Sequence, residues 1–330
     1  MKYKIMILLL VLLVLGLSSA YAGDENAKVG TAGALELTIP YGSRGVAMGG
    51  AVLSTVTGVE SMYWNPAGMA STEGTEVMFT HLPYFADIDV NYVGLTSFVE
   101  GFGTIGLGAK IVTIGDMNET TEEFPDGTGR VFSPTLSVFN LSFAKVLNTN
   151  VQFGINAKFI HENVFDVSAT GAAFDFGFIY NPQWNGLSLG IVIKNYGTEM
   201  QYSGIGFDRE IDNRPLSGNS AKFELPSSIN FGMGYNLHED DLSIATFSGT
   251  FQSNNFSQDV WNGGLEYVYD NTYSLRGGYK YSDGSEFIYG ASFGAGVKFN
   301  VGDMDLSMEY TWTQTDVFDN NQYFTFKANF

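Results

Sequence analysis

The segment DMDLSMEYTWT, residues 303–313, alternates between polar and apolar side chains along its whole length. The apolar positions run from Met304 to Trp312 at every second residue. This period-two pattern indicates a β-strand with one polar and one apolar face. In a soluble sandwich the apolar face would pack in a core, whereas in a membrane barrel it would face lipid. Alternation alone leaves both architectures open.

Similar segments recur along the chain and suggest fourteen strands. Many of them reach ten residues, whereas strands of soluble proteins average five or six and membrane-spanning strands need about 9–11. An even strand number is typical of bacterial outer-membrane barrels. The expected strands cover residues 75–83, 89–98, 103–114, 134–147, 151–162, 171–180, 187–196, 223–236, 241–252, 259–268, 272–281, 287–299, 303–314 and 321–330.

The connections between these strands alternate in length. Every second connection is short, and the remaining ones include the two longest, 115–133 and 197–222. A barrel with one end toward the periplasm and the other toward the exterior has this asymmetry. The aromatic Phe330 at the end of the last amphipathic strand resembles the assembly signal of outer-membrane barrels. We therefore expect an all-β protein, a 14-stranded antiparallel transmembrane β-barrel over residues 75–330.

Residues 1–22 have the features of a secretory signal peptide. Two lysines, Lys2 and Lys4, precede an apolar run that ends in the small-residue cleavage motif Ala20-Tyr21-Ala22. The run is shorter than the roughly 20 residues that a transmembrane helix needs, which disfavours a membrane anchor. Export and a barrel together predict the outer membrane of a Gram-negative-type envelope. The chain contains no Cys, so disulfides cannot stabilise it.

The charge excludes some classes of partner. A net charge of −19 argues against nucleic acid, which needs a basic surface. Three separated His and no Cys do not make a transition-metal site, so we expect neither a metal nor a cofactor. The motifs GxGxxG at 101–106 and GxSxG at 290–294 lie in strand segments and lack the helix that each motif requires. The sequence therefore predicts no enzyme, and outer-membrane lipids are the expected surroundings.

About fifty residues, 23–74, precede the first strand. Barrels of eight strands fill their interior with side chains, whereas sixteen to eighteen strands leave an aqueous channel. A lumen of fourteen strands would leak if it were empty. We therefore expect residues 23–74 to fold into the barrel as a plug, or hatch, rather than to form a disordered leader.

The sequence SMYWNPAGMAS, residues 61–71, is the most distinctive part of this plug. Pro66 disfavours a helical conformation at Asn65, so the chain should bend there after a short helical turn at 59–64. Gly68 would then permit a tight turn. The large side chains of Tyr63, Trp64 and Met69 are expected to contact the barrel wall.

Charged residues inside the expected strands indicate which face lines the lumen. A charge that faces lipid costs about 2–4 kcal/mol at the bilayer midplane. We expect these side chains to point inward and to pair with carboxylates of the plug or wall, and we hypothesise that Arg44 of the plug joins them. The inward-facing charges are Lys158, Arg276, Lys280, Lys298, Glu309 and Lys327.

The stretch from Ile39 to Ser71 resembles the N-terminal signature of the PorV/PorQ family and, more distantly, that of the FadL-type fatty-acid transporters. The match includes Ser43-Arg44, the small residues 47–51, and residues 63–70. Val56-Thr57 stand where the family has an acidic pair. The plug positions that the resemblance singles out are Arg44, Gly45, Met48, Gly49, Gly50, Tyr63, Trp64, Asn65, Pro66, Gly68 and Met69.

The resemblance implies two possible functions, neither of them enzymatic. PorV-type proteins act in type IX secretion, so the leading interpretation is a component of protein secretion or surface attachment that binds secreted proteins or secretion-system components. Its candidate partner residues in the loop 197–222 are Tyr202, Phe207, Arg209 and Arg214. The alternative is a FadL-like passive transporter of hydrophobic small molecules, which would bind beside the hatch and leave sideways.

Overall fold

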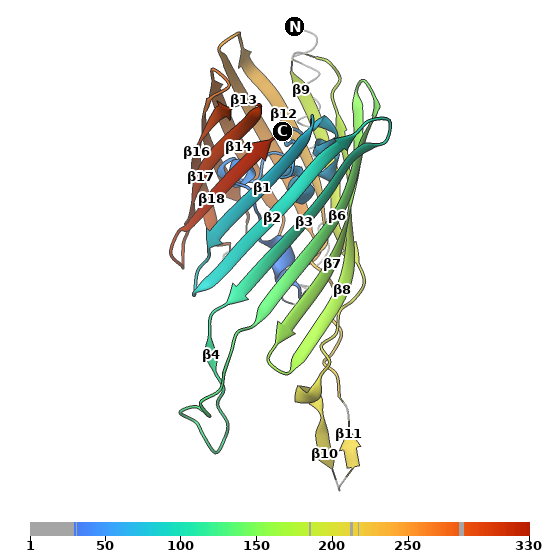
Figure 1. Cartoon of the computed structure of the whole chain (residues 1–330), viewed down its shortest axis with the longest axis vertical. Helices are drawn as coiled ribbons and strands as arrows, with labels where there is room; N and C mark the ends of the chain where they lie inside the picture. Colours follow the sequence, from blue (N-terminus) through green and yellow to red (C-terminus); the bar gives the residue numbers. More distant parts are fainter. Residues whose placement is uncertain (1–29, 31, 185, 212–213, 217, 284–286) are drawn as a thin grey trace.

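A computed structural model of the chain describes residues 30, 32–184, 186–211, 214–216, 218–283 and 287–330, without the side chains of 209–211 and 214–216. The predicted signal peptide lies outside the described residues. Fourteen antiparallel strands form a closed barrel, which confirms the predicted fold class (Figure 1). Each strand pairs with its neighbours along the chain, and β1 pairs with β18 from Glu76↔Asn329 to His81↔Phe324. No described helix is long and apolar enough to cross a bilayer.

The strands that make up the barrel wall agree closely with the fourteen expected segments. They are β1 (Thr75–Pro83), β2 (Ile88–Val99), β3 (Gly103–Ile114), β6 (Thr135–Asn148), β7 (Val151–Val164), β8 (Val167–Tyr180), β9 (Leu187–Gly197), β12 (Ser228–Glu239), β13 (Ser243–Asn254), β14 (Val260–Tyr269), β15 (Tyr273–Tyr281), β16 (Tyr289–Val301), β17 (Met304–Thr315) and β18 (Asn321–Asn329).

The largest differences from the expected boundaries lie at the start of β12 and at the turn between β7 and β8. The strand expected at 223–236 begins only at Ser228, because Phe223 leaves the wall and pairs with Met200 in an isolated bridge. β7 and β8 continue through most of the expected 163–170 loop and meet at a tight turn. Phe165 in that turn has a left-handed backbone with φ of 53°.

The faces of β17 decide between a soluble and a membrane barrel. Met308 and Tyr310 are 49% and 39% exposed on the outside, whereas Thr311 and Thr313 are buried. The apolar face thus points outward and the polar face inward, which is the reverse of a soluble sandwich. A bilayer would cover such an apolar exterior.

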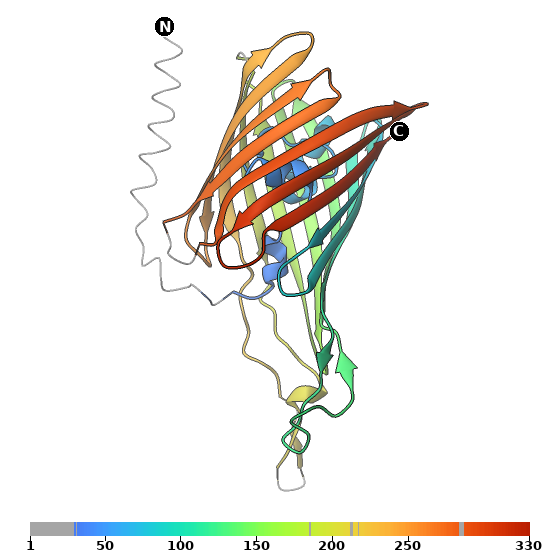
Figure 2. The same ribbon diagram turned by 90° about the vertical axis from the view of Figure 1, so that its left-hand side faces the viewer.

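The long connections leave the barrel at one end, which we call the long-loop end (Figures 1 and 2). The connection after β3 contains the short strands β4 (Met117–Asn118) and β5 (Val131–Phe132). The connection after β9 contains η4 (Ile205–Phe207), β10 (Arg209–Ile211) and β11 (Arg214–Leu216). The opposite, short-turn end carries the C-terminus.

Residues 32–74, the inner segment, lie inside the barrel (Figure 2). They enter at the long-loop end, where Ala32 forms a bridge with Glu224, and they reach β1 at the short-turn end, where the Phe98 amide donates to the Gly74 carbonyl. The helices of this segment are η2 (Leu35–Thr38), α2 (Ser43–Ala47), α3 (Ser61–Trp64) and η3 (Pro66–Ser71). Residues of the inner segment such as Met48 and Met62 share one apolar core with wall residues such as Met78 and Tyr92.

The outward orientation of Met308 can be tested by substitution. Met308→Arg places a charge in the lipid and should lower the free energy of unfolding by about 2–4 kcal/mol. Unfolding by denaturant in lipid vesicles measures the effect. Val317→Arg, at a 71% exposed site in the turn after β17, is the matched control and should change little. Equal effects of the two substitutions would contradict the assignment of the apolar face to lipid.

Candidate functional site

The Asn65-Pro66 pair anchors the inner segment to the wall. α3 ends at Trp64, and Asn65 is extended with φ of −156° because Pro66 disfavours a helical residue before it. The buried side-chain amide of Asn65 donates through its Nδ2 to the backbone carbonyls of Leu53 (2.8 Å) and Phe178 (3.1 Å). Its Oδ1 accepts from the Ala67 amide at 3.1 Å and caps η3. Asparagine supplies the two donors and one acceptor that this position uses.

Glycines in the wall make room for the inner segment. A Cβ on Gly177 of β8 would lie 2.0 Å from the Asn65 Oδ1, and one on Gly154 of β7 would lie 2.2 Å from the Pro66 carbonyl carbon. Gly68, which the sequence predicted to permit a tight turn, lies in the short helix η3. A Cβ on it would lie 2.2 Å from the Val56 carbonyl oxygen, so close packing accounts for this glycine.

The small-residue run at 47–51 packs in the same way against the other side of the wall. Gly49 and Gly50 have positive φ of 64° and 86°, which glycine tolerates. A Cβ on Gly278 of β15 would lie 2.2 Å from the Gly49 nitrogen. Met48 and Met69 are both fully buried. A Cβ on Gly45 would lie 2.1 Å from the Trp64 Nε1, so these two positions of the inner segment pack on each other.

A chain of buried ion pairs, the lumen charge network, joins the inner segment to four wall strands. Arg44 contacts Glu266 through two hydrogen bonds of 2.9 and 2.7 Å. Arg276 bridges Glu266 (2.7 Å) and Glu309 (3.1 Å). Lys327 then bridges Glu309 (3.1 Å) and Glu60 (2.9 Å).

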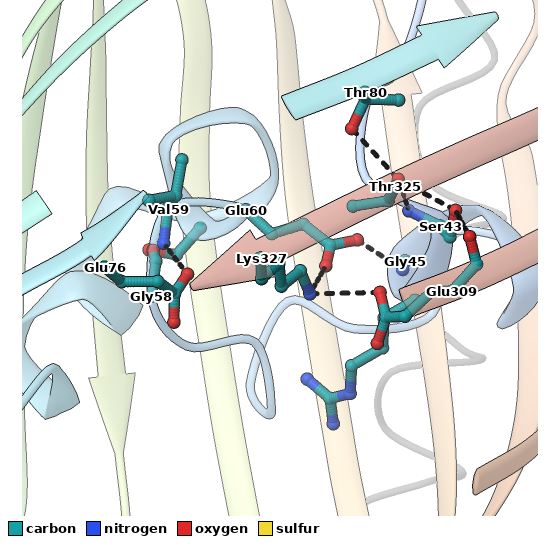
Figure 3. A network of polar contacts seen from close by, with 12 residues as sticks. Ser43, Gly45, Gly58, Val59, Glu60, Glu76, Thr80, Glu309, Thr325 and Lys327 are labelled. Atoms are coloured by element: carbon teal, nitrogen blue, oxygen red, sulfur yellow. Dashed lines mark hydrogen bonds and ion pairs between the residues drawn. The ribbon is translucent and has the colours of Figure 1, made fainter. Parts of the chain in front are cut away.

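Figure 3 shows how Glu60 closes this network within the inner segment. Its second oxygen accepts from the Gly45 amide at 2.6 Å. Nearby, Ser43 is hydrogen-bonded to Thr325 of β18 at 2.8 Å (Figure 3). Losing one partner of a buried pair leaves an uncompensated charge, so the network favours one position of the segment.

The remaining predicted charges also lie on the lumen side. Lys158 pairs with Asp175 at 2.6 Å, and Lys298 pairs with Asp305 at 2.8 Å near the short-turn end. The Lys280 nitrogen lies 5.0 Å from the centre of the Tyr289 ring. Sequence reasoning missed further lumen charges that occupy the same faces and that the same alternation could have found. These include Lys110, Glu162, Asp175, Lys194 and Glu266.

A cavity of about 260 Å³ lies between the inner segment and the long-loop end. Tyr63 and Trp64 belong to its lining, together with aromatic side chains of the wall and the turns. The Lys194 nitrogen lies 3.6 Å from the centre of the Tyr63 ring. Among the described residues, no carboxylate forms an ion pair with the cavity residues Lys194 and Lys280. The other aromatic lining residues are Tyr84, Phe256, Phe287, Tyr289 and Tyr323.

The candidate partner residues occupy different environments. The Tyr202 hydroxyl donates to Glu162 of β7, and its ring packs against Phe223 with 5.7 Å between ring centres. Tyr202 therefore belongs to the barrel opening and is not a free loop side chain. Phe207 ends η4 and is half-buried. Arg209 and Arg214 lie in the paired strands β10 and β11, and their side chains lie outside the described residues.

Comparison with solved structures identifies the architecture. The TodX deltaS2S3 mutant monoaromatic hydrocarbon channel has a TM-score of 0.56 and 14% identity over 88% of this chain and 97% of that one. The chain has the FadL-type barrel fold. The CymD monoaromatic hydrocarbon channel (TM-score 0.54, 15% identity) covers 88% of this chain and 96% of its own. A Pseudomonas aeruginosa FadL homologue (0.54, 14%) covers 88% and 98%.

These identities establish the FadL-type fold alone. The sequence matches no protein-family model and no curated protein. The finer resemblance to PorV/PorQ is not shown by the structural matches.

The tight fit between inner segment and wall predicts a large effect of a single methyl group. Gly177→Ala should force Asn65 away from the wall and destabilise the protein by about 1–3 kcal/mol, as overpacking does. It should also raise the single-channel conductance in planar bilayers, because a displaced inner segment fills the lumen less well. Gly263→Ala is the control, since no atom lies within 4 Å of the new Cβ. Wild-type conductance and stability in Gly177→Ala would refute the close fit.

Proposed function

We propose that this protein is a non-enzymatic outer-membrane channel that admits hydrophobic small molecules passively and binds them in the lumen cavity. The observation that carries the proposal is the cavity with many aromatic lining residues between the inner segment and the long-loop end. Its volume of about 260 Å³ exceeds the roughly 150 Å³ in which an engineered protein cavity holds benzene. The solved structures named as toluene transporter and monoaromatic hydrocarbon channels support the same reading.

The lining of the cavity narrows the class of molecule. Tyr63 and Trp64 give the side of the cavity formed by the inner segment an aromatic surface. The ammonium groups of Lys194 and Lys280 would attract an anionic or polar substituent at the other end of the molecule. A monoaromatic molecule with one such substituent fits this combination of apolar and cationic surface.

The wall beside the cavity offers a route into the membrane. An apolar groove of about 410 Å³ follows the outside of β8, β9 and β12–β14, and Thr250 and Asn262 line both this groove and the cavity. Gly249 and Gly263 face each other across β13 and β14, so the wall is thin there. The opposite route, past the inner segment, would bring an apolar molecule against the lumen charge network. We therefore propose exit sideways between β13 and β14.

The secretion role has weaker support. It depends on the likeness of the inner-segment sequence to PorV/PorQ, and Tyr202, one of its candidate partner residues, is engaged with Glu162. The two long loops at the long-loop end are the surfaces that a secreted protein would contact under that reading. With the long loops outside the cell, both functions place the short-turn end in the periplasm.

The proposed function is tested by uptake of radiolabelled toluene and benzoate into cells that express the protein. Expressing cells should accumulate either compound faster than cells with an empty vector. The pair Gly249→Cys/Gly263→Cys in the Cys-free chain tests the route, because register partners are close enough for a disulfide. Oxidation should lower the uptake rate, and reduction should restore it.

A matched pair, Leu141→Cys/Ala157→Cys, joins register partners on β6 and β7 and should not affect uptake. Uptake equal to the empty-vector cells would refute the channel itself. If the oxidised Gly249→Cys/Gly263→Cys variant still takes up the compounds at the wild-type rate, the sideways route between β13 and β14 is refuted.

A further inference from the structure

Two tyrosines form part of the outer end of the lumen cavity. Tyr84 follows directly after β1 and Tyr289 begins β16, so both lie at the long-loop end of the barrel. Both residues line the cavity, together with Tyr63 and Trp64 of the inner segment. Their hydroxyl groups are hydrogen-bonded to each other at 2.8 Å. A molecule that enters the cavity from the long-loop end passes this tyrosine pair on its way to the inner segment.

A local irregularity of β16 turns Tyr289 toward the cavity. Tyr289 and Ser292 both face the lumen, where the Ser292 hydroxyl donates to the Ala47 carbonyl at 3.2 Å. In a regular strand, side chains three positions apart point to opposite faces. The pairing of β16 with β17 shifts register between Tyr289 and Ser292, and such a bulge changes the direction of a side chain.

The turn between β1 and β2 positions Tyr84. Ala86 and Asp87 in this turn both have left-handed backbones, with φ of 58° and 57°, which is uncommon for residues other than glycine. The ring of Phe85 stacks on Phe318 in the turn after β17, with 4.1 Å between ring centres. The turn is thus held by an apolar contact next to β17 and by the hydrogen bond of Tyr84 on the side of the cavity.

The hydrogen bond between the tyrosines should affect different aromatic molecules differently. Neither hydroxyl has another hydrogen-bond partner among the described residues, and the neighbouring rings of Phe85 and Phe287 offer no hydrogen-bonding group. A molecule that separates the two tyrosines and carries a hydroxyl group can replace the bond that is lost, because a hydroxyl both donates and accepts. A hydrocarbon leaves both tyrosine hydroxyls without a partner, which is costly.

We propose that Tyr84 and Tyr289 form a selective entrance to the lumen cavity, and that their hydrogen bond favours aromatic molecules with a hydroxyl group over aromatic hydrocarbons. This inference rests on the proposed transport function and adds the step of entry to the sideways exit between β13 and β14. A pair that served only to brace the long-loop end of the barrel would contribute to stability and leave the choice of molecule unchanged. Selectivity therefore separates the two roles.

Uptake of radiolabelled toluene and benzyl alcohol tests the proposal, because these two uncharged molecules differ by one hydroxyl group. After subtraction of the rate in empty-vector cells, cells with the wild-type protein should take up benzyl alcohol faster than toluene. Tyr84→Phe and Tyr289→Phe each remove the hydrogen bond and keep the ring. Each should raise toluene uptake, and its ratio to benzyl alcohol uptake, about two- to tenfold, which is the effect of one neutral hydrogen bond. The double variant should take up toluene at the rate of the single variants, since all three lose the same bond.

Tyr310→Phe is the matched control, because the Tyr310 hydroxyl is hydrogen-bonded to Gln322 at 3.0 Å on the outside of the barrel. Its ratio of toluene to benzyl alcohol uptake should equal that of the wild type. The heat-dependent gel shift of a folded barrel verifies that each variant folds.

The outcomes distinguish this inference from the proposed function. If the wild type takes up neither compound faster than empty-vector cells, the channel itself is refuted. If the wild type takes up both compounds and the Tyr84→Phe and Tyr289→Phe variants keep its uptake ratio, the channel stands and the selective entrance is overturned. An unchanged ratio with a lower unfolding temperature would assign the pair to bracing the long-loop end.

Discussion

A closed barrel of fourteen strands encloses more space than its own side chains fill, and the rest of this structure follows from how that space is occupied. The inner segment fills it through close backbone contact. Glycines at the points of contact, Gly154 and Gly177 on one side and Gly278 on the other, remove the Cβ atoms that would hold it away. The high glycine content is therefore partly a property of the interface between segment and wall.

Charge fixes the position of the inner segment within this shape. The inner segment contributes Arg44 at one end of the lumen charge network and Glu60 at the other. The wall residues between them run from Glu266 to Lys327. Buried ion pairs add little net stability relative to apolar packing, but a displaced partner leaves a charge unpaired. Glycine contacts thus set how closely the segment packs, and the ion pairs set where it lies.

Much of the fold could be predicted from the sequence, because each strand carries its own period-two pattern. The prediction was wrong at the start of β12, where Phe223 continues the local pattern but pairs with Met200 in an isolated bridge and packs against a cluster that includes the wall residues Ile160 and Ala173. At Gly68 the local sequence indicates only a tight turn, whereas the need for glycine comes from the carbonyl of Val56, which packs against it. Local patterns do not show contacts between residues that are brought together only by the fold.

The candidate site was predicted less completely than the fold. The inward direction of Lys327 and Arg276 follows from the cost of charge in lipid, but the partners Glu60 and Glu266 depend on how strands come together across the lumen. Glu36 and Glu162 are a similar case, since they line one cavity although 126 positions separate them in the sequence. Neither pair has a signature within a short stretch of sequence.

The central claim is that the inner segment is a fixed, packed part of the barrel, and amide hydrogen exchange tests it most directly. In detergent micelles or lipid, the backbone amides of Gly45 and Asn65 donate hydrogen bonds inside the lumen. Their hydrogens should therefore exchange with solvent as slowly as those of the neighbouring strands. Exchange of residues 43–70 at the rate of the exposed 115–134 loop would contradict the account and indicate a leader that does not fill the lumen.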